Sequence, residues 1–250
     1  MATPANLDWQ FLNNQIGNSL ENSYGDTNIF ATDHLSKLRN LAGDVDIDRL
    51  IARTETAYAA FQASYTTWQK STAYWKGATN RTDAMIDSLL SAKLPRWDIL
   101  IQVSYAQDSY EYITLFPNGR TAFRDAGKDG KIQLLNTFVS IIADYPSLAP
   151  IKTDAAAFYG TIAAARDQQQ QREQNVRDSS TQLREAQAEM FIILYQNLGA
   201  LMDKYGRKTE EILNFFDVSM IRNTNRAKNI DETAKIVAIE DTNIDTTPGV

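Results

Sequence analysis

Apolar residues recur every three or four positions over most of the chain between about residue 32 and residue 222, a spacing that places them on one face of an α-helix. From Asp46 to Trp75 this face carries aliphatic and aromatic residues, namely Leu50, Ala57, Phe61, Tyr65, Trp68 and Trp75. A further periodic stretch begins at Asp83, and Pro95 predicts a kink or a break near Lys93 because proline has no amide hydrogen to donate. The pattern therefore predicts a protein built almost entirely from helices.

The same order of signals occurs twice, in residues 33–116 and again in residues 131–216, at a displacement of about 98 to 100 residues. Each half opens with a short periodic stretch, turns at Gly43-Asp44 or Pro146-Ser147, and continues into a long helical run. At a displacement of about 98 residues, Trp97 and Leu100 match Tyr195 and Leu198. Each half closes on aromatic residues, at Leu115-Phe116 and at Phe215-Phe216. This echo indicates an internal duplication, although any two amphipathic helices resemble each other to some extent.

We therefore predict an all-α fold, an antiparallel bundle of long helices built from two repeats and followed by a short strand-like C-terminal tail. The expected organisation is an N-terminal irregular segment (1–31), repeat 1 (32–116), a connecting loop (117–130), repeat 2 (131–222), and a linker with an extended tail (223–250). The two repeats are expected to pack as one domain. Phe116 and Phe123 are expected to pin the connecting loop to the bundle, and Lys235–Glu240 is the segment with strand character.

Each repeat has a polar centre, residues 77–82 in the first and 175–180 in the second, and these residues are compatible with two structures. Gly77 and Asn80 disfavour an uninterrupted helix, and Ser179 and Gln182 have the spacing of a capping box, so residues 77–82 and 175–180 favour a hairpin in each repeat. The alternative is one continuous helix per repeat, about 75 Å long at 1.5 Å per residue, with a solvated middle. The second repeat is the weaker case for a hairpin, because no Gly or Pro interrupts it from Thr161 to Leu198.

Composition narrows the classes of function. The 250 residues carry a net charge of −6, with 43% hydrophobic and 22% charged residues, which is typical of a folded globular protein. A nucleic-acid partner is not expected, because such a surface needs clustered Lys and Arg. The absence of Cys excludes disulfides and thiol chemistry. Residues 1–9 lack the features of a standard secretory signal, so we expect a cytoplasmic protein or one exported without such a signal.

Candidate chemistry is sparse, and the sequence assigns no catalytic, cofactor-binding or metal-ligating residue. His34 is the single histidine, and its place at the start of a helical run favours a surface or helix-start role. Asp44, Asp46 and Asp48, with Glu55, superficially resemble a calcium loop. Arg49 stands where such a loop needs Gly, so helix-start acids are the better interpretation.

Two further groups of residues favour structural roles. The aromatic residues at helical spacing are expected in the core more than in a ligand pocket: Tyr65, Trp68, Tyr74, Trp75, Trp97 and Tyr105. Gln168–Gln171 is expected to be a solvated helix face, with a partner contact as the alternative. No phosphate-binding glycine loop and no Glu-x-x-His pair occur, so the sequence predicts no cofactor.

Three classes of function remain. We favour a structural or interaction module that binds a protein partner or copies of itself. A small-molecule binder or enzyme is the first alternative, with helix acids such as Asp83, Asp87 or Glu189 in a site between hairpins. A membrane-acting helical protein is the second, suggested by the apolar stretch Met190–Met202, which Gln196, Asn197 and Gly199 interrupt.

Overall fold

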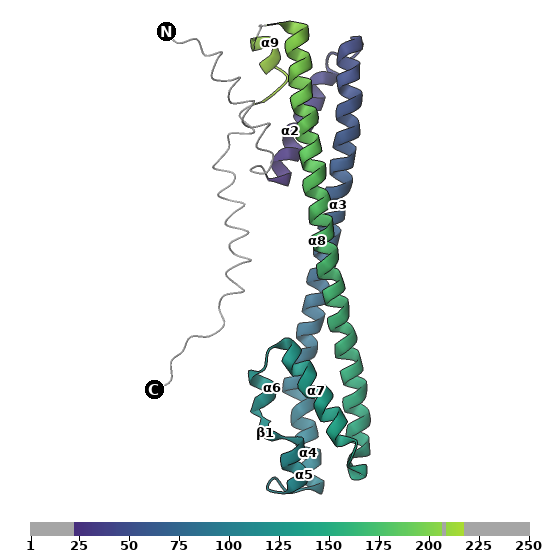
Figure 1. The fold of residues 1–250 in the computed structure, drawn as a ribbon, viewed down its shortest axis with the longest axis vertical. Helices are drawn as coiled ribbons and strands as arrows, with labels where there is room; N and C mark the ends of the chain where they lie inside the picture. Colours follow the sequence, from purple (N-terminus) through teal and green to yellow (C-terminus); the bar gives the residue numbers. More distant parts are fainter. Residues whose placement is uncertain (1–22, 207–208, 218–250) are drawn as a thin grey trace, which may run out of the picture. The chain divides into compact units, whose positions relative to one another are not determined.

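The computed structural model describes residues 23–206 and 209–217, and nearly all of them are helical (Figure 1). The elements are α2 (Tyr24–Arg39), α3 (Val45–Ser88), α4 (Leu94–Ser104), α5 (Tyr110–Leu115), the short extended segment β1 (Pro117–Arg120), α6 (Thr121–Asp125), α7 (Lys128–Ile142), α8 (Ala149–Tyr205) and α9 (Thr209–Leu213). A π-helical turn (Leu89–Lys93) joins α3 to α4, and a 3₁₀ turn (Pro146–Leu148) precedes α8. The predicted all-α class is confirmed. The strand-like segment Lys235–Glu240 lies outside the described residues.

The chain divides into two units, which are described separately. Of the described residues, unit 1 contains 23–67, 180–206 and 209–217, and unit 2 contains 68–179. Both boundaries fall inside long helices, since α3 continues to Ser88 and α8 begins at Ala149. Each long helix therefore contributes one end to each unit, and the units differ from the consecutive repeats expected from the sequence.

Unit 1 packs α2 and α9 against the first part of α3 and the last part of α8. Ser23 starts α2 by accepting a hydrogen bond from the Asp26 amide at 3.1 Å, which satisfies one of the free N–H groups at the helix start. Figure 1 shows α2 and α9 beside the C-terminal part of α8. The core of unit 1 consists of Phe30, Ala31, Leu38, Ile47, Leu50, Met190, Phe191, Leu194, Leu198, Leu201, Ile212, Phe215 and Phe216.

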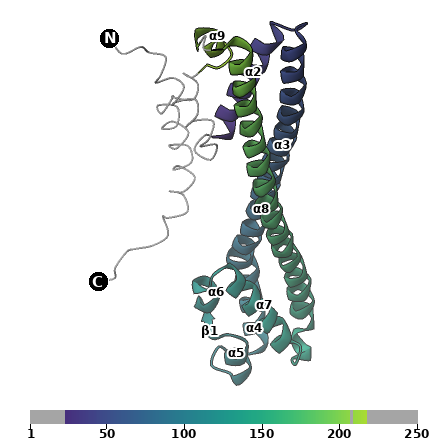
Figure 2. The same cartoon turned by 45° about the horizontal axis from the view of Figure 1, so that its top comes forward.

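Unit 2 gathers α4, α5, α6 and α7 around the last part of α3 and the first part of α8 (Figure 2). Leu135, Phe138 and Ile142 supply one buried face of α7, at the spacing of three and four residues that a helix requires. The core of unit 2 consists of Ile86, Leu89, Leu94, Trp97, Ile101, Leu115, Phe116, Phe123, Leu135, Phe138, Ile142, Leu148, Ile151, Ala155 and Ile162.

The helices begin earlier than the sequence pattern suggested. The first described helix starts at Tyr24, inside the segment 1–31 that we expected to be irregular, because the Ser23 cap and the buried residues Thr27 and Phe30 extend the helix toward the N-terminus. The connecting loop 117–130 likewise holds β1, α6 and the start of α7. Phe116 and Phe123 are buried in the unit 2 core, as predicted.

The predicted hairpins are wrong, because α3 and α8 run without interruption through residues 77–82 and 175–180. The polar side chains of the first centre join the two helices: Gln169 donates to the Thr79 hydroxyl at 3.0 Å, and Thr82 donates to the Ala165 carbonyl at 3.3 Å. In the second, the Ser179 hydroxyl donates to the Val176 carbonyl of its own helix instead of capping a new one. Contacts between helices and along one helix thus override local signals for a break.

The interruption that Pro95 predicted near Lys93 is confirmed. The Leu94 amide donates to the Leu89 carbonyl, five residues back, so one extra residue is held in a wider turn before α4 begins. The residue matches made at a displacement of about 98 are wrong. Trp97 is buried whereas Tyr195 is exposed, and Leu100 is exposed whereas Leu198 is buried.

Candidate functional site: a buried polar cluster in unit 1

The most distinctive polar group among the described residues is a cluster inside unit 1. It consists of His34 on α2, Arg53 and Thr54 on α3, Asn197 on α8 and the backbone carbonyl of Phe215 after α9. His34, Thr54 and Asn197 are fully buried. Buried polar groups cost free energy unless they are paired, so the geometry of this cluster decides what it does.

The hydrogen bonds fix the state of His34. Its Nδ1 lies 2.9 Å from the Phe215 carbonyl oxygen, which can only accept, so Nδ1 carries the proton. Its Nε2 lies 2.9 Å from Nδ2 of Asn197, which can only donate, so Nε2 is the acceptor. His34 is therefore the neutral tautomer with both ring nitrogens paired. The Phe216 ring stacks on the imidazole, with the centroids 4.3 Å apart.

Asn197 is the centre of the cluster. Its amide nitrogen also donates to the Thr54 hydroxyl at 2.7 Å, and its oxygen accepts from Nε of Arg53 at 2.5 Å. Thr54 completes the chain of hydrogen bonds by donating to the Leu50 carbonyl at 2.6 Å. The network therefore links α2, α3, α8 and the segment after α9.

Burial lowers the pKa of His34 from its usual 6.5 to about 4. The hydrogen bond to the Phe215 carbonyl opposes this shift, and the positive charges of Lys37 and Arg53 add to it. Burial also lowers the pKa of Arg53, and the nearby charge of Arg49 acts in the same direction. One terminal nitrogen of Arg53, Nη2, is buried without a hydrogen-bond partner among the described residues.

This arrangement does not resemble a catalytic centre. The His34 imidazole has both nitrogens engaged and is fully covered, so a general base would have no substrate proton within reach. The Thr54 hydroxyl donates to a backbone carbonyl of its own helix and not to a base. The expected surface role of His34 is wrong, because the residue lies on the buried face of α2 with Phe30, Ala31, Leu35 and Leu38. The geometry instead fastens the end of the described chain to three helices.

The acids that resembled a calcium loop start α3, as the sequence favoured. The Asp44 carboxylate accepts from the amides of Asp46 and Ile47 at 3.0 and 3.3 Å, and Asp48 accepts from the Gly43 amide at 3.0 Å. Lys204 bonds both carboxylate oxygens of Asp44 at 2.7 Å and, with these amides, lowers the pKa of Asp44. Glu55 pairs instead with Arg39 at 2.6 Å.

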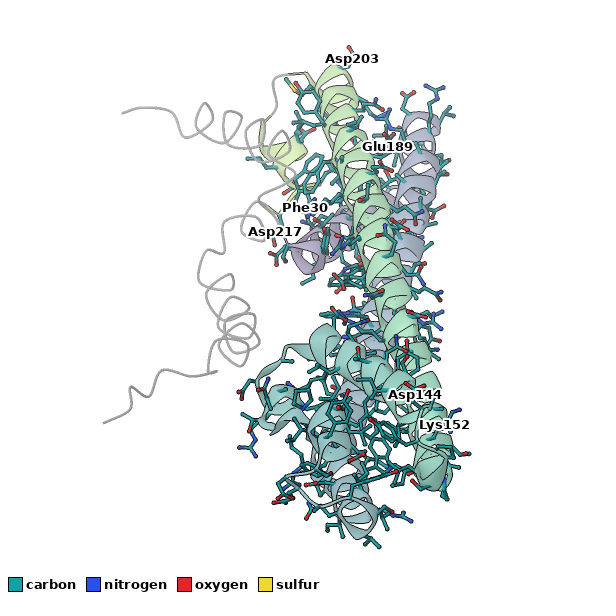
Figure 3. All side chains as sticks on the ribbon, turned by 60° about the horizontal axis from the view of Figure 1, so that its bottom comes forward. Phe30, Asp144, Lys152, Glu189, Asp203 and Asp217 are labelled. Atoms are coloured by element: carbon teal, nitrogen blue, oxygen red, sulfur yellow. The ribbon has the colours of Figure 1, made fainter. Side chains whose placement is uncertain are left out.

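The three acids considered for an enzyme site are not brought together as a set. Asp83 and Asp87 belong to unit 2, whereas Glu189 belongs to unit 1. Asp83 forms an ion pair with Lys128 at 2.6 Å. Asp87 is exposed, and Glu189 lies on α8, where Figure 3 labels it. Within the part of the chain that the structure describes, no group of three or more His, Asp or Glu side chains could hold a metal ion.

The aromatic residues occupy several environments. Trp97 lies in the unit 2 core, where it stacks on Phe138 with the centroids 5.6 Å apart and donates from Nε1 to Asp154 at 2.9 Å. Lys93 pairs with the same carboxylate at 2.7 Å, and this pair together with the indole lowers the pKa of Asp154. Tyr74 is exposed, with the Arg172 guanidinium over its ring. The remaining four are Tyr65, Trp68, Trp75 and Tyr105, and they lie partly buried.

The glutamine run Gln168–Gln171 is only partly a solvated face. Gln168, Gln170 and Gln171 are not buried, as expected, but Gln169 is buried. Its amide oxygen accepts from Arg166 at 2.9 Å, while its amide nitrogen donates to Thr79. The buried member therefore stabilises unit 2.

Asn197, Thr54 and Arg53 were not predicted from the sequence. The available signal was the position of Asn197 in the helical register of Leu194, Leu198 and Leu201, where a polar residue must find a partner. The partners themselves come from elements far away in the sequence, so no local pattern marks them.

Neither a family model, nor a curated protein, nor a solved structure matches this chain. Among the helices of residues 23–206 and 209–217, none combines the length and the apolarity needed to cross a bilayer.

Proposed function

We propose that this protein is a non-enzymatic helical interaction module, a component of a larger assembly that binds a protein partner or further copies of itself. The single observation that carries the proposal is the exposure of large apolar side chains on the outer faces of packed helices. On α4 and α5 in unit 2 they are Ile99, Leu100, Val103, Tyr110 and Ile113, and on α8 in unit 1 they are Ile192, Tyr195 and Met202. Clustered exposed apolar residues mark interaction surfaces on folded proteins.

The spacing of these residues supports the proposal. Ile99 and Val103 are four residues apart on α4, and Ile192 and Tyr195 are three apart on α8, so each set lies along one side of its helix. An apolar stripe of this kind suits a partner helix or a flat apolar surface. The buried polar cluster contributes rigidity, because it fastens the segment around Phe215 to α2, α3 and α8.

We also propose that the fold arose by internal duplication. The order of elements supports it: α2, a turn and α3 are followed by α5 and the buried Phe116, and α7, a turn and α8 are followed by α9 and the buried Phe216. Buried positions also correspond at one constant displacement of 101 residues between residues 47–89 and residues 148–190. The pairs are Ile47 with Leu148, Leu50 with Ile151, Thr54 with Ala155, Phe61 with Ile162, Thr82 with Leu183, Ile86 with Gln187 and Leu89 with Met190.

Beyond the π-helical turn the displacement shortens by one residue, as an extra residue in that turn requires. The buried pairs are then Leu94 with Leu194, Trp97 with Asn197, Asp98 with Leu198, Ile101 with Leu201, Leu115 with Phe215 and Phe116 with Phe216. In this register the buried Trp97 is paired with the buried Asn197, whereas the displacement of about 98 paired it with the exposed Tyr195.

Contacts correspond as well as burial. In unit 1, His34 stacks on Phe216 and Arg53 donates to Asn197. The buried residues of α2 and α7 correspond at a displacement of 104, which pairs His34 with Phe138 and Leu38 with Ile142. At the corresponding places in unit 2, Phe138 contacts Phe116 with the centroids 5.2 Å apart, and Trp97 donates to Asp154. The polar cluster of unit 1 and the aromatic cluster of unit 2 are, on this proposal, two versions of one ancestral contact.

The same correspondence supports the antiparallel arrangement that the sequence suggested. The core of unit 1 combines the beginning of α3 with the end of α8, and the core of unit 2 combines the end of α3 with the beginning of α8. On this proposal each unit joins the first half of one repeat to the second half of the other.

Site-specific photo-crosslinking tests the interaction module. A photoreactive phenylalanine analogue is placed singly at Val103, at Ile192 or at Gln170, a polar control, and the cells that make the protein are irradiated. We expect discrete protein adducts from Val103 or Ile192 and none from Gln170. Adducts missing at both apolar positions, or equally abundant at Gln170, would overturn the proposal.

A further inference from the structure

Five large apolar residues on the consecutive helices α4 and α5 are exposed, and we call them together the α4–α5 face: Ile99, Leu100, Val103, Tyr110 and Ile113. Val103 and Tyr110 are 80% and 78% exposed, respectively. The opposite side of α4 packs inward through Leu94, Trp97 and Ile101. The Tyr112 hydroxyl donates to Asp98 at 2.8 Å and thereby holds α5 against α4.

The internal correspondence provides a control for this surface. The positions of α8 that correspond to Ile99, Leu100 and Val103 are Gly199, Ala200 and Asp203, whose side chains are absent, small or charged. At these three positions unit 1 thus carries no large apolar side chain. The fold itself does not demand them, so the apolar character of the α4–α5 face serves something outside the unit.

The charges around the face are arranged in a self-complementary order. Arg96 lies in the first turn of α4, in the same helical row as Leu100 and Val103. Asp108 is exposed and follows the C-terminal end of α4, and Glu111 lies in the first turn of α5. Among the described residues, no ion pair involves any of these three. The face therefore runs from a positive end through an apolar middle to a negative end.

We propose that the α4–α5 face binds the same face of a second copy of this chain about a two-fold axis. A two-fold axis brings each residue opposite its partner's counterpart in both directions, so Arg96 of each copy meets Asp108 of the other while the apolar middles cover one another. A partner with a uniformly basic or acidic rim would leave one end of the face facing a like charge. The inference rests on the proposed function and names the partner of that surface.

Sedimentation of the full chain over a range of concentrations tests the apolar part of the proposal. The chain should dimerise, and Val103→Glu should weaken dimerisation by about tenfold or more, because it places a charge within an apolar contact. Ile192→Glu, a matched change on the exposed stripe of α8, should leave the dimer unaltered. Thermal unfolding of both variants at a concentration where they are monomeric checks that they fold. A monomer at all concentrations, or a dimer insensitive to Val103→Glu, would overturn the proposal.

Charge exchange tests the two-fold geometry. Arg96→Glu and Asp108→Arg should each weaken self-association by several-fold to about tenfold, because each variant opposes like charges at both ends of the interface. An equimolar mixture of the two variants should recover wild-type affinity. In a mixed dimer the introduced glutamate of one copy faces the introduced arginine of the other, and the remaining native Asp108 faces the remaining native Arg96. A mixture as weak as the separate variants would reject the pairing.

The crosslinking experiment separates this inference from the proposed function. An adduct of twice the chain mass from Val103 supports the two-fold dimer. An adduct with a different protein from Val103, without any self-adduct, would overturn the dimer and leave the interaction module standing. If adducts formed at neither Val103 nor Ile192, both proposals would fail.

Discussion

His34 and Phe216 lie face to face, with their ring centroids 4.3 Å apart and their ring planes inclined by 17°. The first residue belongs to the first described helix and the second is almost the last described residue. The backbone carbonyl of Phe215 accepts a hydrogen bond from the same imidazole. One side chain thus attaches the end of the described chain by both stacking and a hydrogen bond, and Phe30, labelled in Figure 3, adds a third ring at 6.1 Å from Phe216.

Acidification should destabilise the protein through His34. Its folded pKa of about 4 lies below its usual 6.5, so the unfolded chain takes up the proton first as the pH falls. The neutral imidazole makes its full contribution to the free energy of unfolding above pH 6.5, and this contribution is lost between pH 6.5 and 4. The loss is up to about 1.4 kcal/mol per pH unit and about 3 kcal/mol in all. Urea unfolding between about pH 7.5 and 5 measures the slope before most carboxylates titrate.

The chain has a single histidine, so His34→Gln supplies a clean control. The variant should be less stable at neutral pH and should show almost no change in unfolding free energy between about pH 7.5 and 5. An equal slope in the wild type and the variant would show that other groups cause the acid sensitivity.

Asn197→Ala should destabilise unit 1 by about 2 to 4 kcal/mol, because it leaves His34 Nε2 without a donor, Arg53 Nε without an acceptor and a cavity between helices. Denaturant unfolding followed by circular dichroism measures the loss. Gln196→Ala, at the adjacent exposed position, should change stability by less than about 0.5 kcal/mol. Equal costs for the two changes would contradict the central role of Asn197.

Gly77→Ala should stabilise the protein by about 0.5 to 1 kcal/mol. Gly77 lies within α3, and an added Cβ would meet no atom within 4 Å, so alanine contributes its better helix propensity without a clash. Gly43→Ala should destabilise by about 1 kcal/mol or more, because Gly43 has a φ of 103° in the turn before α3. Thermal unfolding distinguishes the two, and a destabilising Gly77→Ala would indicate a break in α3.

Phe216→Ala and Phe116→Ala should each cost about 3 to 5 kcal/mol, because both rings are buried, at the ends of the two repeats that we propose. Hydrogen exchange should localise the first effect to unit 1 and the second to unit 2. If one ring could be removed at little cost while the other could not, the proposed correspondence of the two aromatic ends would be wrong.

The features that depend on neighbouring residues could be predicted from the sequence. The all-α class follows from helical periodicity, the turn at Gly43 from the conformational freedom of glycine, and the interruption before α4 from Pro95. Phe116 and Phe123 could be assigned to the core because large apolar residues in a polar loop need somewhere to pack.

The predictions that were wrong concern features that depend on contacts between residues far apart in the sequence. Local signals at Gly77 and Ser179 indicated helix ends, but the hydrogen bond from Gln169 to Thr79 makes the first polar centre a contact between helices. The burial of His34 depends on Asn197, which lies 163 residues away. A single sequence carries no sign of such a pairing.

At the π-helical turn Leu89–Lys93, the number of residues can change without changing the direction in which the following buried side chains point. An insertion of one residue in an ordinary α-helix rotates everything after it by about 100°. Here the wider turn absorbs the extra residue, and Leu94, Trp97 and Ile101 still point inward. We expect that deletion of one residue from this turn would leave a regular helix whose later side chains keep their places, so a change of length between α3 and α4 need not change the core.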